Sequence, residues 1–91
     1  VNESNGVVAF SVYPNPSGNQ FNLDFNLTQS VGGENVIFRI FDVSGKEVKA
    51  LRVNEGLQQI DVAELENGMY IYRLQTVDGK DLRSGKWVKT L

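Results

Sequence analysis

This chain of 91 residues contains no histidine and no cysteine, so it lacks the usual catalytic base, and paired carboxylates are the acid–base groups that remain to be weighed. That absence excludes a thiolate nucleophile, a disulfide and a Cys/His zinc site. Paired carboxylates can catalyse reactions when they converge in a cleft. Most of the candidate carboxylates stand at predicted turns or on the polar face of a strand, so we expect no enzyme. The candidates are Asp24, Asp42, Asp61, Glu64, Glu66, Asp78 and Asp81.

Calcium binding is the next chemistry to weigh, because Asp78-Gly79-Lys80-Asp81 places two acids in one loop. The segment is too short for an EF-hand loop and carries a lysine in its middle. An Asp-Gly pair between two apolar runs is instead typical of a hairpin turn. We therefore expect no metal site and no cofactor.

Aromatic rings could form a sugar-binding surface, which requires exposed and coplanar side chains. Phe21, Phe25 and Phe38 alternate with polar or smaller residues and are expected in the core. Tyr13, Tyr72 and Trp87 fit either a core or a sugar platform.

The composition predicts one folded domain with a thin core. The apolar fraction is 41%, which is in the globular range, and the net charge of −2 with no basic cluster argues against nucleic acid as a partner. We read residues 1–8 as the end of a linker and 9–91 as the domain. Because the chain starts at Val1 rather than methionine, we expect it to be the C-terminal piece of a longer protein.

Alternating apolar residues predict seven strands that must position any site. The clearest is 20–27, where Phe21, Leu23, Phe25 and Leu27 alternate with polar residues. The others are 7–13, 35–41, 47–54, 57–62, 68–77 and 82–91. In 47–54 we expect Val48 and Ala50 on one face and an irregularity at Leu51. With one helical turn at 63–67 and a loop at 29–34, this pattern predicts an all-β fold, a seven-stranded antiparallel Ig-like β-sandwich.

Two turns carry the strongest local signals. Pro14-Asn15-Pro16 predicts a rigid turn, because two prolines lack the N–H groups that a sheet requires. In 42–46, Gly45 can take the positive φ that a short hairpin needs, with Lys46 after it. Gly68 meets a similar backbone requirement before the sixth strand. Each of these residues has a purely structural interpretation.

The final strand contains Lys86-Trp87-Val88-Lys89-Thr90-Leu91. It fits an edge strand protected by lysines. It also fits a strand that a partner recognises through added backbone pairing and charge. An exposed edge could likewise pair two copies as a weak homodimer.

Taken together, Tyr13-Pro14-Asn15-Pro16, the Gly45-Lys46 hairpin, Asn67-Gly68-Met69-Tyr70 and the lysine-containing C-terminus resemble the type A C-terminal sorting domain of the Bacteroidetes type IX secretion system. The resemblance extends from about Val8 to Leu91. Glu66 departs from it where a proline is frequent, and Thr90-Leu91 extend past the last lysine. The positions that the family marks fall on Pro14, Asn15, Pro16, Gly45, Lys46, Gly68, Tyr70, Lys86 and Lys89.

The resemblance implies a non-catalytic signal domain carried by an N-terminal cargo domain of the same chain. Its implied partners are the outer-membrane type IX translocon and a sortase-like peptidase that cuts in the linker within or before residues 1–8. The cargo would pass through the periplasm and then be released or joined to a surface lipopolysaccharide. A carbohydrate-binding module and an Ig-like spacer of an extracellular enzyme are the alternatives.

Overall fold

The computed structural model describes residues 7–27 and 36–90, with side chains from Ala9 onward in the first segment. Residues 1–6 of the predicted linker at 1–8 and the loop at 29–34 lie outside them, whereas Val7 and Val8 are already part of the first strand. Seven strands follow one another along the chain, and the described residues form no helix. They are β1 (Val7–Tyr13), β2 (Gln20–Leu27), β3 (Val36–Asp42), β4 (Glu47–Val53), β5 (Gly56–Asp61), β6 (Gly68–Thr76) and β7 (Asp81–Lys89).

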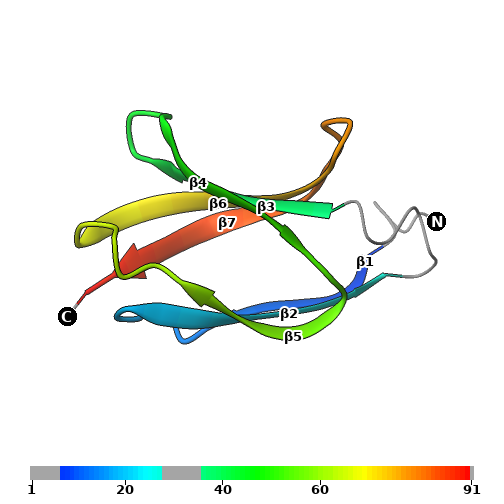
Figure 1. Cartoon of the computed structure of the whole chain (residues 1–91), viewed down its shortest axis with the longest axis horizontal. Helices are drawn as coiled ribbons and strands as arrows, with labels where there is room; N and C mark the ends of the chain where they lie inside the picture. Colours follow the sequence, from blue (N-terminus) through cyan, green and yellow to red (C-terminus); the bar gives the residue numbers. More distant parts are fainter. Residues whose placement is uncertain (1–6, 28–35, 91) are drawn as a thin grey trace.

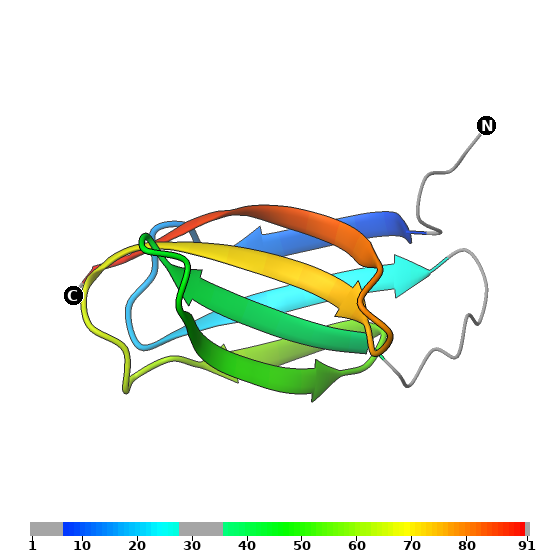
Figure 2. The same ribbon diagram turned by 90° about the horizontal axis from the view of Figure 1, so that it is seen from above.

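The strands form two antiparallel sheets that pack face to face (Figure 1). Sheet A has the order β1-β2-β5, and sheet B has the order β4-β3-β6-β7. All five strand pairings are antiparallel. This arrangement confirms the predicted seven-stranded antiparallel β-sandwich. β1 and β7 are the edge strands on one side of the sandwich and lie next to each other when the molecule is seen from above (Figure 2).

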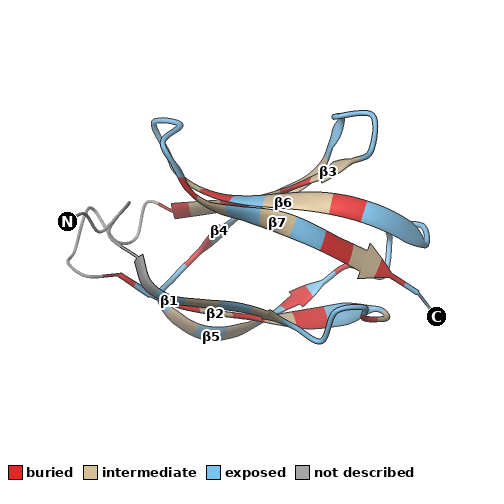
Figure 3. Ribbon diagram, turned by 180° about the vertical axis from the view of Figure 1, so that it is seen from behind, coloured by how far each residue is buried: buried red, intermediate tan, exposed pale blue. Residues whose placement is uncertain are grey.

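The core lies between the sheets, and buried residues alternate with more exposed ones along most of the strands (Figure 3). Phe21, Phe25 and Phe38 are buried, as their alternation predicted. Trp87 is also fully buried, and its ring centroid lies 4.8 Å from that of Phe21 and 5.2 Å from that of Tyr70. The last strand therefore supplies the largest side chain of the core.

Two local predictions need correction. The irregularity of the β3–β4 hairpin is a register shift between Ile40 and Phe41, opposite Glu47 and Lys49, and not at Leu51. Because Val48 is the extra residue of this bulge, it packs on the core while Ala50 is exposed on the other face. Residues 63–67 form no helical turn; a single hydrogen bond of 3.0 Å, from the amide of Leu65 to the carbonyl of Val62, closes a tight turn there.

Candidate functional site

The nine positions marked from the sequence lie toward one end of the sandwich, which we call the motif end. It is formed by turns 14–19, 42–46 and 62–67 together with the last residues of β7. The chain enters β1 at the opposite end, beside turns 54–55 and 77–80 (Figure 1). The antiparallel topology thus separates the marked residues from the point where a preceding domain would be attached.

The Pro14-Asn15-Pro16 turn is fastened to the outer edge of β7. The side-chain amide of Asn15 donates to the carbonyl of Lys86 and accepts from the amide of Val88, both at 3.0 Å. An asparagine side chain therefore pairs with the strand as a neighbouring backbone would. Both peptide bonds that precede these prolines are cis, and both proline rings are exposed.

Ser17 continues this attachment with its own backbone. Its amide donates to the carbonyl of Val88 at 3.0 Å, and its carbonyl accepts from the amide of Thr90 at 2.8 Å. Its hydroxyl accepts a hydrogen bond of 2.6 Å from the indole nitrogen of Trp87. Ser17 and Trp87 are both buried, so this bond satisfies an N–H group that water cannot reach. We call the contacts of Asn15 and Ser17 with β7 the β7 clamp.

The β7 clamp changes the interpretation of the final strand. On the outer edge of β7, Asn15 is already hydrogen-bonded to the carbonyl of Lys86 and the amide of Val88. Ser17 is hydrogen-bonded to the carbonyl of Val88 and the amide of Thr90. An added strand would have to displace them. Of the exposed edge that was predicted at residues 86–91, the described part, 86–90, is therefore covered by the chain itself.

The hairpin turn at 42–46 is organised by Asp42. Its carboxylate oxygen Oδ1 accepts from the hydroxyl of Ser44 at 2.6 Å, from the amide of Ser44 at 2.9 Å and from the amide of Lys46 at 3.0 Å. The Ser44 hydroxyl and then the Lys46 amide hold the pKa of Asp42 below its usual value. Gly45 has φ of +92°, which confirms the positive φ expected of it. This carboxylate holds the turn and is not free for acid–base chemistry.

Tyr70 closes the end of the core next to Gly68. Its ring is buried, and its hydroxyl donates to the carbonyl of Glu66 at 2.6 Å. Burial raises the pKa of the Tyr70 phenol, and the nearby Glu66 carboxylate adds to the rise. Gly68 has φ of +152°, so the backbone bends there at the start of β6. Both residues shape the turn that precedes β6.

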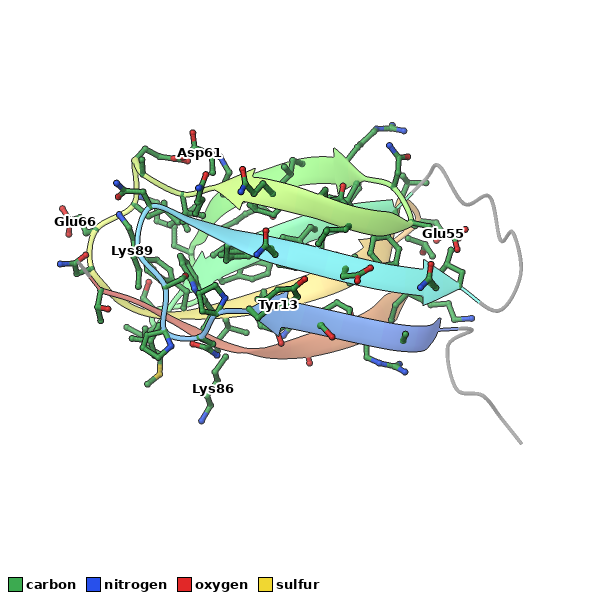
Figure 4. All side chains as sticks on the ribbon, turned by 90° about the horizontal axis from the view of Figure 1, so that it is seen from below. Tyr13, Glu55, Asp61, Glu66, Lys86 and Lys89 are labelled. Carbon is green, nitrogen blue, oxygen red and sulfur yellow. The ribbon has the colours of Figure 1, made fainter. Side chains whose placement is uncertain are left out.

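The two marked lysines of β7 lie on opposite sides of the strand (Figure 4). The Lys89 side chain points inward and is only 2% exposed, and its ammonium donates to the carbonyls of Ala63 and Leu65. Lys86 is exposed to solvent. Lys89 therefore supports the turn at 62–65, whereas Lys86 is available at the surface.

A groove of about 450 Å³ opens at the motif end between the turn at 42–46 and the segment 64–70. Beside it, Glu64 accepts a hydrogen bond of 2.8 Å from the ammonium of Lys49, which lowers the pKa of Glu64. The described residues contain no group of three histidine, cysteine, aspartate or glutamate side chains that could hold a metal ion. The side chains that line the groove can bind a partner through apolar contacts and charge.

The aromatic residues form no sugar platform in the described structure. Of the three ambiguous rings, Trp87 is buried and Tyr72 is half-buried against Phe10 and Phe38. Tyr13 is the exposed ring of this group, at 43%. A single exposed tyrosine does not present the paired, coplanar faces that sugar stacking requires.

Sequence reasoning missed Ser17 and Gly85. Nothing local marks Ser17, because its partner Trp87 is 70 residues away. Gly85 does carry a signal, since a glycine inside a strand often marks a close approach. A Cβ atom at Gly85 would lie 2.4 Å from the hydroxyl oxygen of Tyr72, the residue that faces it on β6.

A family model described as the secretion system C-terminal sorting domain matches residues 11–89. The match confirms the resemblance and covers most of the chain. No curated protein matches the sequence. Among solved structures, the chain is similar to CopC from Methylosinus trichosporium OB3b, with a TM-score of 0.50 and 23% identity over 92% of this chain and 89% of that one. This likeness concerns the β fold alone. No helix among the described residues has the length and apolar character needed to cross a membrane.

Proposed function

The chain belongs to the family of type IX secretion-system C-terminal sorting domains, which are non-catalytic signals that direct secretion of their cargo, and we propose that its motif end is the part that the outer-membrane translocon recognises. The observation that carries the proposal is the gathering of all nine family-marked positions toward that end. The cargo, attached through residues 1–8, is then delivered to the cell surface or the medium. The domain acts as a folded handle and makes no bond itself.

The marked residues contribute to recognition in two ways. Asn15, Gly45, Gly68, Tyr70 and Lys89 build the shape of the motif end, because their polar groups or backbones are committed to it. The others present exposed side chains at its surface and can be contacted directly: Pro14, Pro16, Lys46 and Lys86.

We also propose that a sortase-like peptidase removes the domain by cutting before β1. The backbone from Val7 onward is paired with β2 through Leu27, so a cut N-terminal to Val7 leaves the sandwich intact. Mass spectrometry of the released domain measures this directly. A new N-terminus inside residues 8–27 would contradict it.

A transplant tests the proposed function. Residues 1–91 are fused to a periplasm-targeted fluorescent protein in a bacterium that has a type IX system. We expect fluorescence at the surface or in the medium, and its loss in a translocon mutant. Fluorescence that stays in the periplasm of the wild-type host would reject the proposal and favour a spacer role.

The structure dictates which variants test recognition without unfolding the handle. Deleting residues 86–91 should strand the cargo in the periplasm, but it also removes Trp87 from the core. Lys86→Ala changes an exposed side chain and keeps the fold. We expect Lys86→Ala to reduce surface delivery with an unchanged melting temperature, and Ala50→Ser, also exposed but on β4, to change neither.

A weak homodimer through β7 or β1 is part of the same proposal. The β7 clamp covers the second half of β7, so we propose the outer edge of β1, the edge strand beside it, as the main surface for such pairing. Sedimentation of the isolated domain at increasing concentration tests this association. A monomer at every concentration would remove the dimer from the proposal.

A further inference from the structure

The two sheets carry opposite charge. All nine lysines and arginines lie in the strands of sheet B or in the hairpin turns that join them, with four acids, Asp42, Glu47, Asp78 and Asp81. The strands of sheet A contain no cation and two acids, Asp24 and Asp61. A protein whose net charge is −2 therefore presents a positive sheet on one side.

The outer face of sheet B also carries an apolar patch next to the motif end. Phe41 faces Ile71 across β3 and β6, and Met69 faces Val88 across β6 and β7. Met69 is 47% exposed, and Val43 in the adjoining turn is 74% exposed. Phe41, Val43 and Ile71 line a hollow of about 210 Å³, which is large enough for one or two side chains of a partner. We call these five residues the outer patch.

Cations border the outer patch, and they differ in how far they are already neutralised. Arg73 stacks over the Phe41 ring at 5.5 Å and lies 4.0 Å from Asp81. Arg39, farther along β3, pairs with Glu47 at 2.7 Å. Lys86 stands opposite Ile71 on the neighbouring strand, and the described part of the chain gives its ammonium no ion pair. An incoming acid would thus find an exposed and unpaired charge beside an apolar surface.

We infer that the outer patch docks a protein segment that combines apolar and acidic side chains, supplied by the secretion machinery. The inference rests on the proposed function and names the surface and the chemistry of its partner. Apolar contact with Phe41, Met69 and Ile71 supplies burial, while Lys86 selects an acid and sets the register. An anionic membrane fits less well, because it is usually bound by four to eight clustered basic residues, and here Arg39 and Arg73 already have acidic neighbours.

Photocrosslinking compares the two outer faces in living cells. A benzophenone amino acid replaces Met69 in the secreted reporter fusion, and in a matched control it replaces Leu57, which is 65% exposed on sheet A. We expect an adduct with an envelope protein from position 69 and little or none from position 57. Equal crosslinking from both positions, no adduct from position 69, or an adduct with lipid alone would each overturn the inference.

Substitutions separate this inference from the proposed function. Met69→Asp and Lys86→Glu should each lower surface delivery of the reporter at least tenfold, whereas Leu57→Asp should change it less than twofold. Thermal unfolding of each purified domain shows whether the handle remains folded. If the unsubstituted reporter is not secreted, the proposed function is wrong. If it is secreted, and the folded Met69→Asp and Lys86→Glu variants are secreted equally well, only the proposed docking surface is wrong.

Discussion

The two ends of the sandwich are stabilised over very different distances in the sequence. At the motif end, hydrogen bonds join residues about 70 positions apart, as from Asn15 to Lys86 and from Trp87 to Ser17. At the opposite end, the turn at 76–80 is closed by bonds that span three or four residues. Longer-range bonds there, such as Glu55–Leu27 and Arg39–Gln75, span 28 and 36 residues. The motif end is therefore the part whose order depends on the whole chain, and mutations there should cost more.

The largest test of this contrast is Trp87→Ala at the motif end. Removing a fully buried indole should destabilise the domain by about 3–5 kcal/mol, because it leaves a cavity against Phe21 and Tyr70. Urea unfolding followed by circular dichroism measures the loss. Val77→Ala, at the opposite end and 44% exposed, is the matched control and should cost less than about 0.5 kcal/mol. Comparable losses in the two variants would erase the contrast.

The β7 clamp gives the next effect in size. Ser17→Ala leaves the buried indole N–H without its acceptor and should cost about 1–3 kcal/mol. In a Trp87→Phe background that N–H is absent, so Ser17→Ala should then cost less. A double-mutant cycle measured by urea unfolding gives the coupling energy. A coupling near zero would show that the bond does not fasten β7.

The two lysines of β7 test, within one strand, how much a buried and an exposed side chain contribute to stability. Lys89→Met removes an ammonium that is bonded to the carbonyls of Ala63 and Leu65, and should destabilise the domain by about 2 kcal/mol. Lys86→Met should change stability by less than about 0.5 kcal/mol, since that side chain is exposed. Melting temperatures of the two purified variants decide the point. The reverse order of stability would mean that the two lysines have exchanged roles.

The smallest predicted effect is on the loss of stability at low pH, and the turns at the two ends of the sandwich should contribute to it alike. Hydrogen bonds from Ser44 and from Thr76 hold the pKa values of Asp42 and Asp78, respectively, below the usual value. A folded-state pKa below the unfolded one stabilises the protein at neutral pH, and this contribution disappears as the pH falls through the folded-state value. Asp42→Asn and Asp78→Asn should each flatten the decline of the melting temperature between about pH 5 and pH 3. A variant that declines as steeply as the unsubstituted domain would contradict this.

The sequence predicts well what depends on neighbours along the chain. The alternation in 20–27 places Phe21, Leu23, Phe25 and Leu27 in the core, and Gly45 identifies its turn. Prediction from the sequence fails where a residue interacts with a partner that is far away along the chain. A lysine near a terminus suggests an exposed charge, yet Lys89 is buried because carbonyls of the turn at 62–65 surround its ammonium.

The β7 clamp could not be predicted for a related reason. Asn15 reads as a turn residue, and only the folded chain places its amide against Lys86 and Val88. The edge that seemed exposed is covered by a segment whose sequence gives no sign of strand pairing. Local pattern therefore finds the strands, whereas the identity of the long-range partners comes from the topology.

The position of Trp87 makes folding of the whole domain depend on its seventh strand. A sorting domain follows its cargo, and here the core and the β7 clamp are completed by residues 86–90. A ribosome that stops before residue 87 makes a cargo whose handle lacks its largest core side chain and the strand that Ser17 holds. Folding of the signal thus depends on residues 86–90, so a product truncated before them would lack a folded sorting domain.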